Sequence, residues 1–132
     1  MTGRVKSLFR VARDYAARRI PWLKRARVRF CKQADAAHRH RWRLFAHTEE
    51  DGVYTVCFAR AAERELTDNE ILGMVAHELG HVVGIVEGWP HHSRLKQGTE
   101  TSKAVQDEAD RIARKVLGFR NLRYNKRTLE TL

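Results

Sequence analysis

The chain has 132 residues, enough for one domain with a single modest hydrophobic core. Hydrophobic residues make up 42% of it, and no stretch approaches the roughly 18 consecutive apolar residues that a membrane-spanning helix needs. We therefore expect no membrane association. The formal net charge is +10, and it is distributed unevenly along the chain.

The positive charge is concentrated in residues 1–43, which hold 14 Lys and Arg residues against two acidic ones. The rest of the chain has slightly more acidic than basic residues. Clustered Lys and Arg residues are typical of a surface that binds nucleic-acid phosphates, but also of a solvated helix face that aids solubility. We favour the solvated face, because no nucleic-acid-binding motif accompanies the charge, and we keep nucleic acid as a possible partner.

The N-terminal third predicts a helix followed by a strand. Apolar residues recur at helical spacing across residues 5–20, and Pro21 ends this helix by disfavouring the α conformation of the residue before it. Residues 27–30 alternate with period two, which predicts a strand with its apolar residues facing inward. Residues 33–40 lack apolar periodicity and are predicted to form a loop or a short helical turn.

Two further strands are predicted at residues 42–47 and 53–59. An Asp51-Gly52 turn signal lies between them, so the two strands are expected to form a hairpin. Strands joined in this way pair antiparallel. We therefore expect a small, mainly antiparallel sheet.

Cys31 and Cys57 have no zinc-ribbon spacing, and each lies in a strand-like segment. They are predicted to be buried free thiols, which fits a reducing cytoplasm. The chain shows no internal repeat and no second domain. Residues 1–132 are therefore predicted to form one α+β domain.

A buried helix is predicted to begin at Thr67. Thr67 and Glu70 have the spacing of a capping box, in which each side chain bonds the backbone N–H of the other residue. Apolar residues then lie nearly all round the helix, which is typical of a helix buried on every side. Gly84 and Gly88 are the candidate stop signals at its C-terminal end.

This helix carries the H-E-x-x-H pattern at His77, Glu78 and His81. Residues four apart lie on the same helix face, so the two imidazoles can converge on one Zn²⁺ ion. Glu78 projects beside that position and is the predicted general base, taking a proton from the water that the metal activates. Two hydrogen-bonded structural histidines are the less favoured alternative, because burying these groups without a metal would be costly. The pattern predicts a zinc metallopeptidase acting on a peptide or protein substrate.

A catalytic zinc ion needs a third protein ligand and an open position. Candidates follow the motif in the sequence, namely Glu87, His91, His92, Gln106, Glu108 and Asp110. Glu87 stands where the long metzincin pattern requires a histidine. The last three lie on a C-terminal helix predicted to begin near residue 101 and to end at Gly118. His91 and His92, together with Tyr124, are also candidates for stabilising an oxyanion.

The motif Ala76-His77-Glu78-Leu79-Gly80-His81, followed by a helix over residues 106–113, resembles the ImmA/IrrE-type metallopeptidases of phages, prophages and their hosts. It is also similar to very small stand-alone gluzincins. The resemblance covers roughly residues 53–118. It implies a zincin-like fold, a zinc-dependent peptidase and an active-site helix beneath an edge strand. It also implies a third zinc ligand from a Glu in an E-x-x-A-[DN] helix, with Asp110 orienting a ligand.

This chain departs from the family at the third ligand. The position of the ligand Glu, four residues before Asp110, is occupied by Gln106, whose amide carries no anionic oxygen. Glu108 is two residues further, about 200° round the helix, so the two side chains cannot face the same metal. We predict Glu108 as the ligand, because a carboxylate is chemically preferred and a small shift in the alignment would place it there.

Residues 53–59, just before the metal helix, are expected to present a strand edge to an extended peptide substrate. Two alternatives to an active peptidase stay open. One is a catalytically silent relative, which Gln106 suggests. The other is a nucleic-acid-binding accessory protein with a structural zinc site, which the basic residues 1–43 suggest. The sequence does not indicate the cleavage specificity or the oligomeric state.

Overall fold

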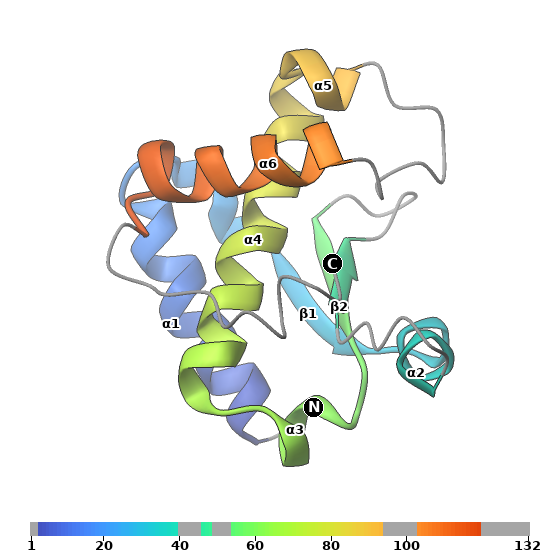
Figure 1. Ribbon diagram of the computed structural model, residues 1–132. Helices are drawn as coiled ribbons and strands as arrows, with labels where there is room; N and C mark the ends of the chain where they lie inside the picture. Colours follow the sequence, from blue (N-terminus) through green and yellow to red (C-terminus); the bar gives the residue numbers. More distant parts are fainter. Residues whose placement is uncertain (1–2, 40–45, 49–53, 94–102, 120–132) are drawn as a thin grey trace.

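The computed structural model describes residues 3–39, 46–48, 54–93 and 103–119. The fold is α+β, as predicted, and helices make up most of it (Figure 1). Its elements are α1 (Arg4–Ala17), the 3₁₀ helix η1 (Pro21–Arg25), β1 (Arg27–Phe30), α2 (Lys32–Arg39), β2 (Ala46–Thr48), β3 (Thr55–Phe58), α3 (Ala62–Glu65), α4 (Asp68–Glu87), α5 (Pro90–Ser93), α6 (Lys103–Arg111) and the π-helical turn η2 (Ile112–Val116).

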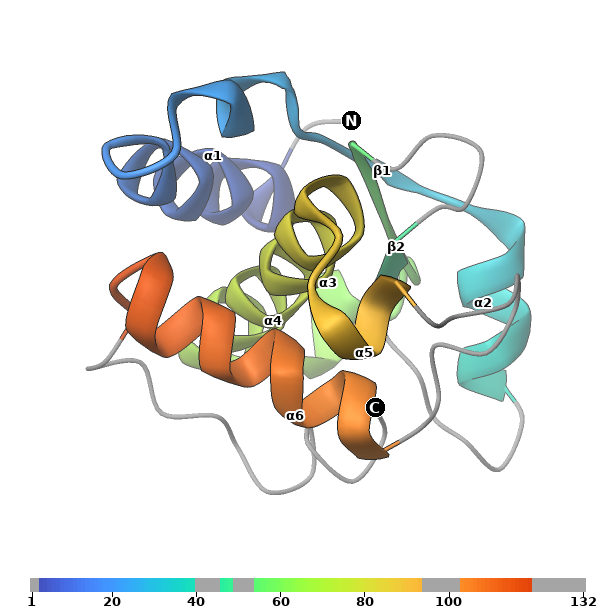
Figure 2. The same ribbon diagram turned by 90° about the horizontal axis from the view of Figure 1, so that it is seen from above.

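Helix α4 is the centre of the molecule. Figures 1 and 2 show it between α1 and α6, with the sheet on its remaining side. Most of its residues are buried, among them the apolar side chains of Ile71, Met74, Leu79 and Val83. The prediction of a helix buried nearly all round is confirmed, and the candidate metal motif therefore lies in the core.

Both ends of α4 follow from local sequence signals. The Thr67 hydroxyl accepts a hydrogen bond from the backbone N–H of Glu70 at 3.2 Å, and the Glu70 carboxylate accepts one from the backbone N–H of Thr67 at 3.0 Å. At the other end Gly88 adopts the left-handed conformation, with φ of 68°, which glycine reaches without steric cost. Gly84 does not end the helix, contrary to one of the two predicted stop signals.

The sheet has three described strands in the order β1-β3-β2. β3 pairs parallel with β1, in a register that aligns Arg27 with Thr55, and antiparallel with β2, where Ala46 aligns with Phe58. The sheet is therefore mixed, and the prediction of a mainly antiparallel sheet was wrong. The reason is that β1 pairs with β3 across a long connection, which no local turn signal announces. The predicted Asp51-Gly52 turn lies outside the described residues.

The central position of β3 corrects a second prediction. Residues 53–59 were expected to present a free edge, but β3 has a strand on each side and is buried from Val56 to Phe58. Among the described strands, β1 and β2 lie at the two edges of the sheet, and β2 also contacts α4. Residues 33–39 of the segment predicted as a loop or a short helical turn lie in the eight-residue helix α2.

Helix α1 is tied to the rest of the fold at both ends. The Arg4 guanidinium donates to the backbone oxygens of Glu63 and Leu66, each at 2.6 Å, beside the start of α4. The Tyr15 hydroxyl donates to the backbone oxygen of Gly118 at 2.8 Å, just after η2. Between these ties, Val5, Phe9, Ala12 and Ala16 are buried in the core. The basic N-terminal region is thus an integral part of the domain.

Cys31 and Cys57 are both buried and form no disulfide, as predicted. In the part of the chain that the structure describes, no helix combines the length and apolarity needed to cross a membrane.

Candidate metal centre

The two motif histidines face each other on α4. His77 and His81 are one turn apart and almost fully buried, and their Nε2 atoms are 3.0 Å apart. The Glu78 carboxylate is also buried, and one of its oxygens lies within 4.8 Å of the ligand atoms of both histidines. The structure therefore brings together the three residues that the sequence motif predicted.

Helix α6 supplies the other side of this cluster. The Gln106 amide oxygen, Oε1, lies 2.6 Å from Nε2 of His77 and 3.0 Å from Nε2 of His81. Asp110, one turn further along the same face of α6, accepts a hydrogen bond from Nδ1 of His77 at 2.8 Å. Nε2 of His77, Nε2 of His81 and Oε1 of Gln106 thus converge at one point. Asp110 contacts the opposite nitrogen of the His77 ring.

Helix α5 contacts the other imidazole from behind. Nε2 of His92 lies 2.9 Å from Nδ1 of His81, and both rings are buried. Nδ1 of His92 in turn lies 2.7 Å from the carboxylate of Glu108, which is 1% exposed. Glu108, His92 and His81 therefore form a buried hydrogen-bonded chain that ends at the convergence point.

Glu108, the predicted third ligand, is placed away from the convergence point. Its carboxylate accepts from the backbone N–H groups of His91 and His92, at 3.0–3.2 Å, as well as from the His92 ring. These two N–H groups begin α5 and have no partner inside that short helix. The position between the two motif histidines is occupied instead by Gln106, the residue set aside in the sequence-based prediction.

The remaining candidates for the third ligand lie elsewhere or contact the site from outside. Glu87 is exposed at the end of α4, and Asp110 and His92 contact the outer nitrogens of the two motif histidines. His91 is half-buried and contributes its backbone N–H to Glu108. Tyr124 lies outside the described residues.

Two glycines on α4 allow this close packing. A methyl group at Gly80 would overlap the backbone carbonyl of Ala109 on α6, so only glycine lets the two helices approach this closely. A methyl group at Gly84 would lie 2.5 Å from Nδ1 of His92. Gly84, which the sequence suggested as a helix end or as part of a metzincin pattern, makes room for the His92 ring.

The electrostatics differ between the two motif histidines. Burial disfavours the charged form of His77, but hydrogen bonding to Asp110 and the nearby charge of Glu78 outweigh this and raise its pKa. Burial and the neighbouring imidazoles of His77 and His92 lower the pKa of His81 well below its ordinary value. The surroundings thus favour the charged form of His77 more than water does, whereas His81 stays neutral at neutral pH.

Glu108 is held as a carboxylate. Burial alone would raise its pKa, but the hydrogen bonds from the His92 ring and from the two backbone N–H groups outweigh burial, so its pKa is lowered. A charged Glu108 can only accept hydrogen bonds. The His92 ring therefore carries a proton on Nδ1, which it donates to Glu108.

The partners of the outer nitrogens bear on where the ring protons lie. When Nε2 of His92 carries no proton, it accepts from Nδ1 of His81, and the lone pair of a neutral His81 then points from Nε2 towards the convergence point. Asp110 likewise holds a proton on Nδ1 of His77. The Gln106 amide oxygen adds an acceptor at the same point. The three atoms repel one another unless a proton or a metal cation lies between them.

The three converging atoms, which repel one another when nothing lies between them, are suited to hold a metal ion. Two imidazole nitrogens and one amide oxygen are suitable zinc ligands in type, although neutral amide oxygen is a weaker donor than carboxylate. In a tetrahedral site with Zn–N distances of about 2.05 Å, two ligand nitrogens are about 3.3 Å apart. The separation of 3.0 Å between the two Nε2 atoms needs only a few tenths of an ångström of opening.

No protein-family model, curated protein or solved structure matches this chain.

Proposed function

We propose that the protein is a zinc-dependent metallopeptidase in which His77, His81 and Gln106 hold the metal and Glu78 is the general base. The observation that supports this most directly is the convergence of the two Nε2 atoms and the Gln106 oxygen, with the outer ring nitrogens engaged by Asp110 and His92. Residues that orient metal-binding imidazoles in this way are a usual part of metal sites.

Zinc bound at this position would polarise a substrate carbonyl and lower the pKa of a water molecule to about 7. Glu78 is buried beside the two histidines, so its carboxylate is placed to accept a proton from the attacking water and then to deliver it to the leaving amine. His81 and His77 stay fixed in orientation during these transfers, because their outer nitrogens are hydrogen bonded.

Gln106 sets the charge of the site. Two imidazoles and an amide are all neutral, whereas the usual gluzincin set includes one carboxylate. A neutral set leaves the full charge of the metal uncompensated, which makes it a stronger Lewis acid but binds it less tightly. The proposed site is therefore a weaker zinc site with a more electrophilic metal.

The edge of the sheet nearest α4 suggests how a peptide would bind. Among the described strands β2 lies at the edge, contacts α4 and pairs on its other side with β3. An extended substrate that adds to this edge would gain main-chain hydrogen bonds close to the metal helix. This is the arrangement that the resemblance to ImmA/IrrE-type peptidases and other zincin-like enzymes implies, and we include that relationship in the proposal.

A catalytically silent relative is the second candidate, and Gln106 is the observation that favours it. Such a protein would keep the fold and the two histidines but would bind zinc too weakly for turnover.

One experiment separates these functions. Wild type, Glu78→Gln and the double variant His77→Ala/His81→Ala are compared on a mixed peptide pool, with zinc measured in each after dialysis. We expect about one zinc per chain in wild type and in Glu78→Gln, and none in the double variant. Cleavage should fall by about 10²–10⁴-fold in Glu78→Gln, which is the usual effect of losing a general base.

Glu87→Gln is the matched control, because it makes the same change at the exposed end of the same helix. It should keep both zinc and activity. Equal cleavage by wild type and Glu78→Gln would contradict the proposed mechanism. Zinc without cleavage in wild type would support the silent relative, and zinc retained in the double variant would refute the site.

A further inference from the structure

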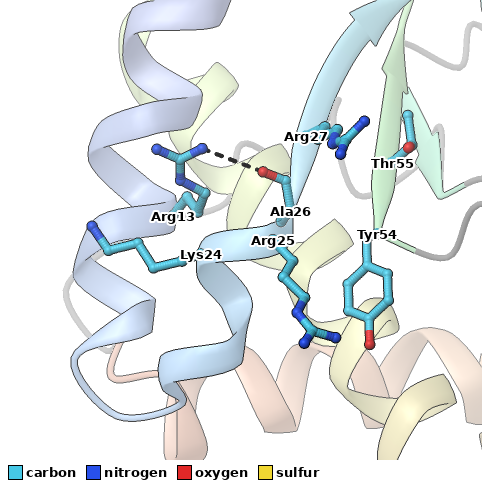
Figure 3. A pocket seen from close by; sticks show the side chains of 7 residues that line it. All are labelled: Arg13, Lys24, Arg25, Ala26, Arg27, Tyr54 and Thr55. Atoms are coloured by element: carbon cyan, nitrogen blue, oxygen red, sulfur yellow. Dashed lines mark hydrogen bonds between the residues drawn. The ribbon is translucent and has the colours of Figure 1, made fainter.

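A second candidate site lies in the basic N-terminal region, away from the metal cluster. A pocket of about 700 Å³ is lined by residues from α1, η1, β1 and the start of β3. Figure 3 shows Arg13, Lys24, Arg25 and Arg27 around it, with Tyr54 on the opposite wall. This volume is in the usual range for a small-molecule or single-nucleotide site.

The charge of the pocket is only partly neutralised. Asp14 lies 3.1 Å from Nε of Arg13 and 3.0 Å from Nζ of Lys24, so it compensates part of their charge. Arg25 and Arg27 are exposed, and within the described ranges of the chain neither has an acidic partner. The pocket therefore keeps an excess of positive charge in a concave surface, where the field on an anion is strongest.

The orientation of the wall is fixed by contacts that leave the guanidinium groups of Arg25 and Arg27 uninvolved. Arg13 donates to the backbone oxygen of Ala26 at 3.3 Å, which joins α1 to the start of β1. Parallel pairing holds Arg27 opposite Thr55. The backbones that carry the cations are therefore held in place by helix and strand contacts.

Tyr54 gives the pocket an aromatic wall. Its ring is half-buried and packs edge-on against Trp22, with ring centroids 5.8 Å apart and an interplanar angle of 83°. An aromatic ring beside several guanidinium groups is the combination with which proteins bind single-stranded nucleic acid, since bases stack on the ring and arginines contact the phosphates.

We propose that this pocket, defined by Arg13, Lys24, Arg25, Arg27 and Tyr54, binds a single-stranded nucleic acid. Arg25 and Arg27 contact successive phosphates, and one base stacks against Tyr54. An acidic peptide has matching charge but no ring to stack on the tyrosine, and the backbone of a duplex does not offer an unpaired base to a pocket. The proposal goes beyond the proposed peptidase activity and does not depend on it.

The test measures binding of the full-length protein to a fluorescein-labelled oligothymidine of roughly 12 nucleotides by fluorescence polarisation, starting at about 50 mM salt. Arg25→Ala/Arg27→Ala removes two charges from the pocket. Arg10→Ala/Lys32→Ala removes two charges from exposed positions in the same basic region, outside the pocket, and is the matched control.

We expect wild type to bind, with affinity that falls steeply as salt rises. The pocket variant should bind at least about tenfold more weakly, and the slope of log K against log salt should decrease by about 1.4, or 0.7 for each lost phosphate contact. The control variant should stay close to wild type. Absence of binding by wild type, or equal loss in both double variants, would overturn the proposal.

Tyr54 tests the stacking contact separately. Tyr54→Phe keeps the ring and should bind like wild type, whereas Tyr54→Leu should bind about 5-fold to 150-fold more weakly. Thermal unfolding of each variant checks that the fold persists. Equal binding by the Phe and Leu variants would overturn the stacking contact. Tighter binding of a matched duplex, or equal binding of polyglutamate, would overturn the assignment to a single strand.

Discussion

The amide oxygen of Gln106 lies 2.6 Å from Nε2 of His77, so a neutral side chain faces the two motif histidines from α6. Gln106 and Asp110 are one turn apart on α6 and contact opposite nitrogens of the same imidazole. Helix α6 therefore contacts both ring nitrogens of His77. This relationship makes residue 106 the position at which the proposed metal site is tested most directly.

Substitution of Gln106 should change zinc affinity in both directions. Gln106→Glu supplies an anionic oxygen at the same distance and should bind zinc more tightly than wild type, while Gln106→Ala should bind it more weakly. Competition with a chromogenic chelator measures both. Unchanged affinity in both variants would show that Gln106 is not a ligand.

The residues behind the histidines should also affect the metal. Asp110→Ala or His92→Ala should weaken zinc binding by about 10–100-fold, because each leaves one imidazole free to rotate or to change tautomer. Asp107→Ala is the control, since Asp107 is exposed on the same helix and pairs with Lys103 rather than with the cluster. A visible spectrum of the cobalt-substituted protein should change in the first two variants and not in the control. An equal effect of all three would refute specific positioning.

Glu108 should matter for stability more than for metal binding by direct contact. Glu108→Gln loses the charge that holds His92 and the start of α5, and we expect the free energy of unfolding to fall by about 2–4 kcal/mol at neutral pH. Asp107→Asn, at an exposed ion pair, should change it by about 0.5 kcal/mol or less. Urea unfolding measures both.

The same variant has a defined pH dependence. Because folding lowers the pKa of Glu108 from its ordinary 4.5, its contribution to stability is present above that value and is lost as the pH falls through the lower, folded-state pKa. The difference in unfolding free energy between wild type and Glu108→Gln should therefore shrink below about pH 4.5. A difference that grows on acidification would contradict the assigned charge state.

Gly80 should not tolerate a side chain. Gly80→Ala would push α4 away from Ala109 on α6 and should destabilise the fold by about 1–3 kcal/mol. It should also lower zinc affinity, since α6 carries Gln106. Gly88→Asn is the comparison, because the position is open and asparagine tolerates its left-handed conformation. Two variants of equal stability would show that α4 and α6 can separate without cost.

Local signals predicted α4 well, because its capping box, its apolar residues and its H-E-x-x-H spacing all lie within one helix. The choice between Gln106 and Glu108 could not be made in the same way. Both residues lie on one amphipathic helix, and which face meets α4 depends on the contact between Gly80 and Ala109, which are distant in sequence. The central place of β3 was missed for the same reason, since its parallel partner β1 is non-local.

The buried hydrogen-bonded chain from Glu108 through His92 to His81 was also missed by the sequence-based prediction. The sequence offered each of these residues as a separate ligand candidate, because adjacent histidines and an acidic helix both suggest metal binding. The structure links them in series instead. The signal that could have revealed this is Gly84, which is needed only if a ring from another segment packs against α4.

The ties of Arg4 to the backbone of Glu63 and Leu66 have a consequence for how this chain can change. Arg4 belongs to the basic N-terminal region, and its guanidinium contacts the segment that leads into α4. Removal of this region would leave the two carbonyl groups without their guanidinium partner. A change of charge at Arg4 therefore also changes the support at the start of α4.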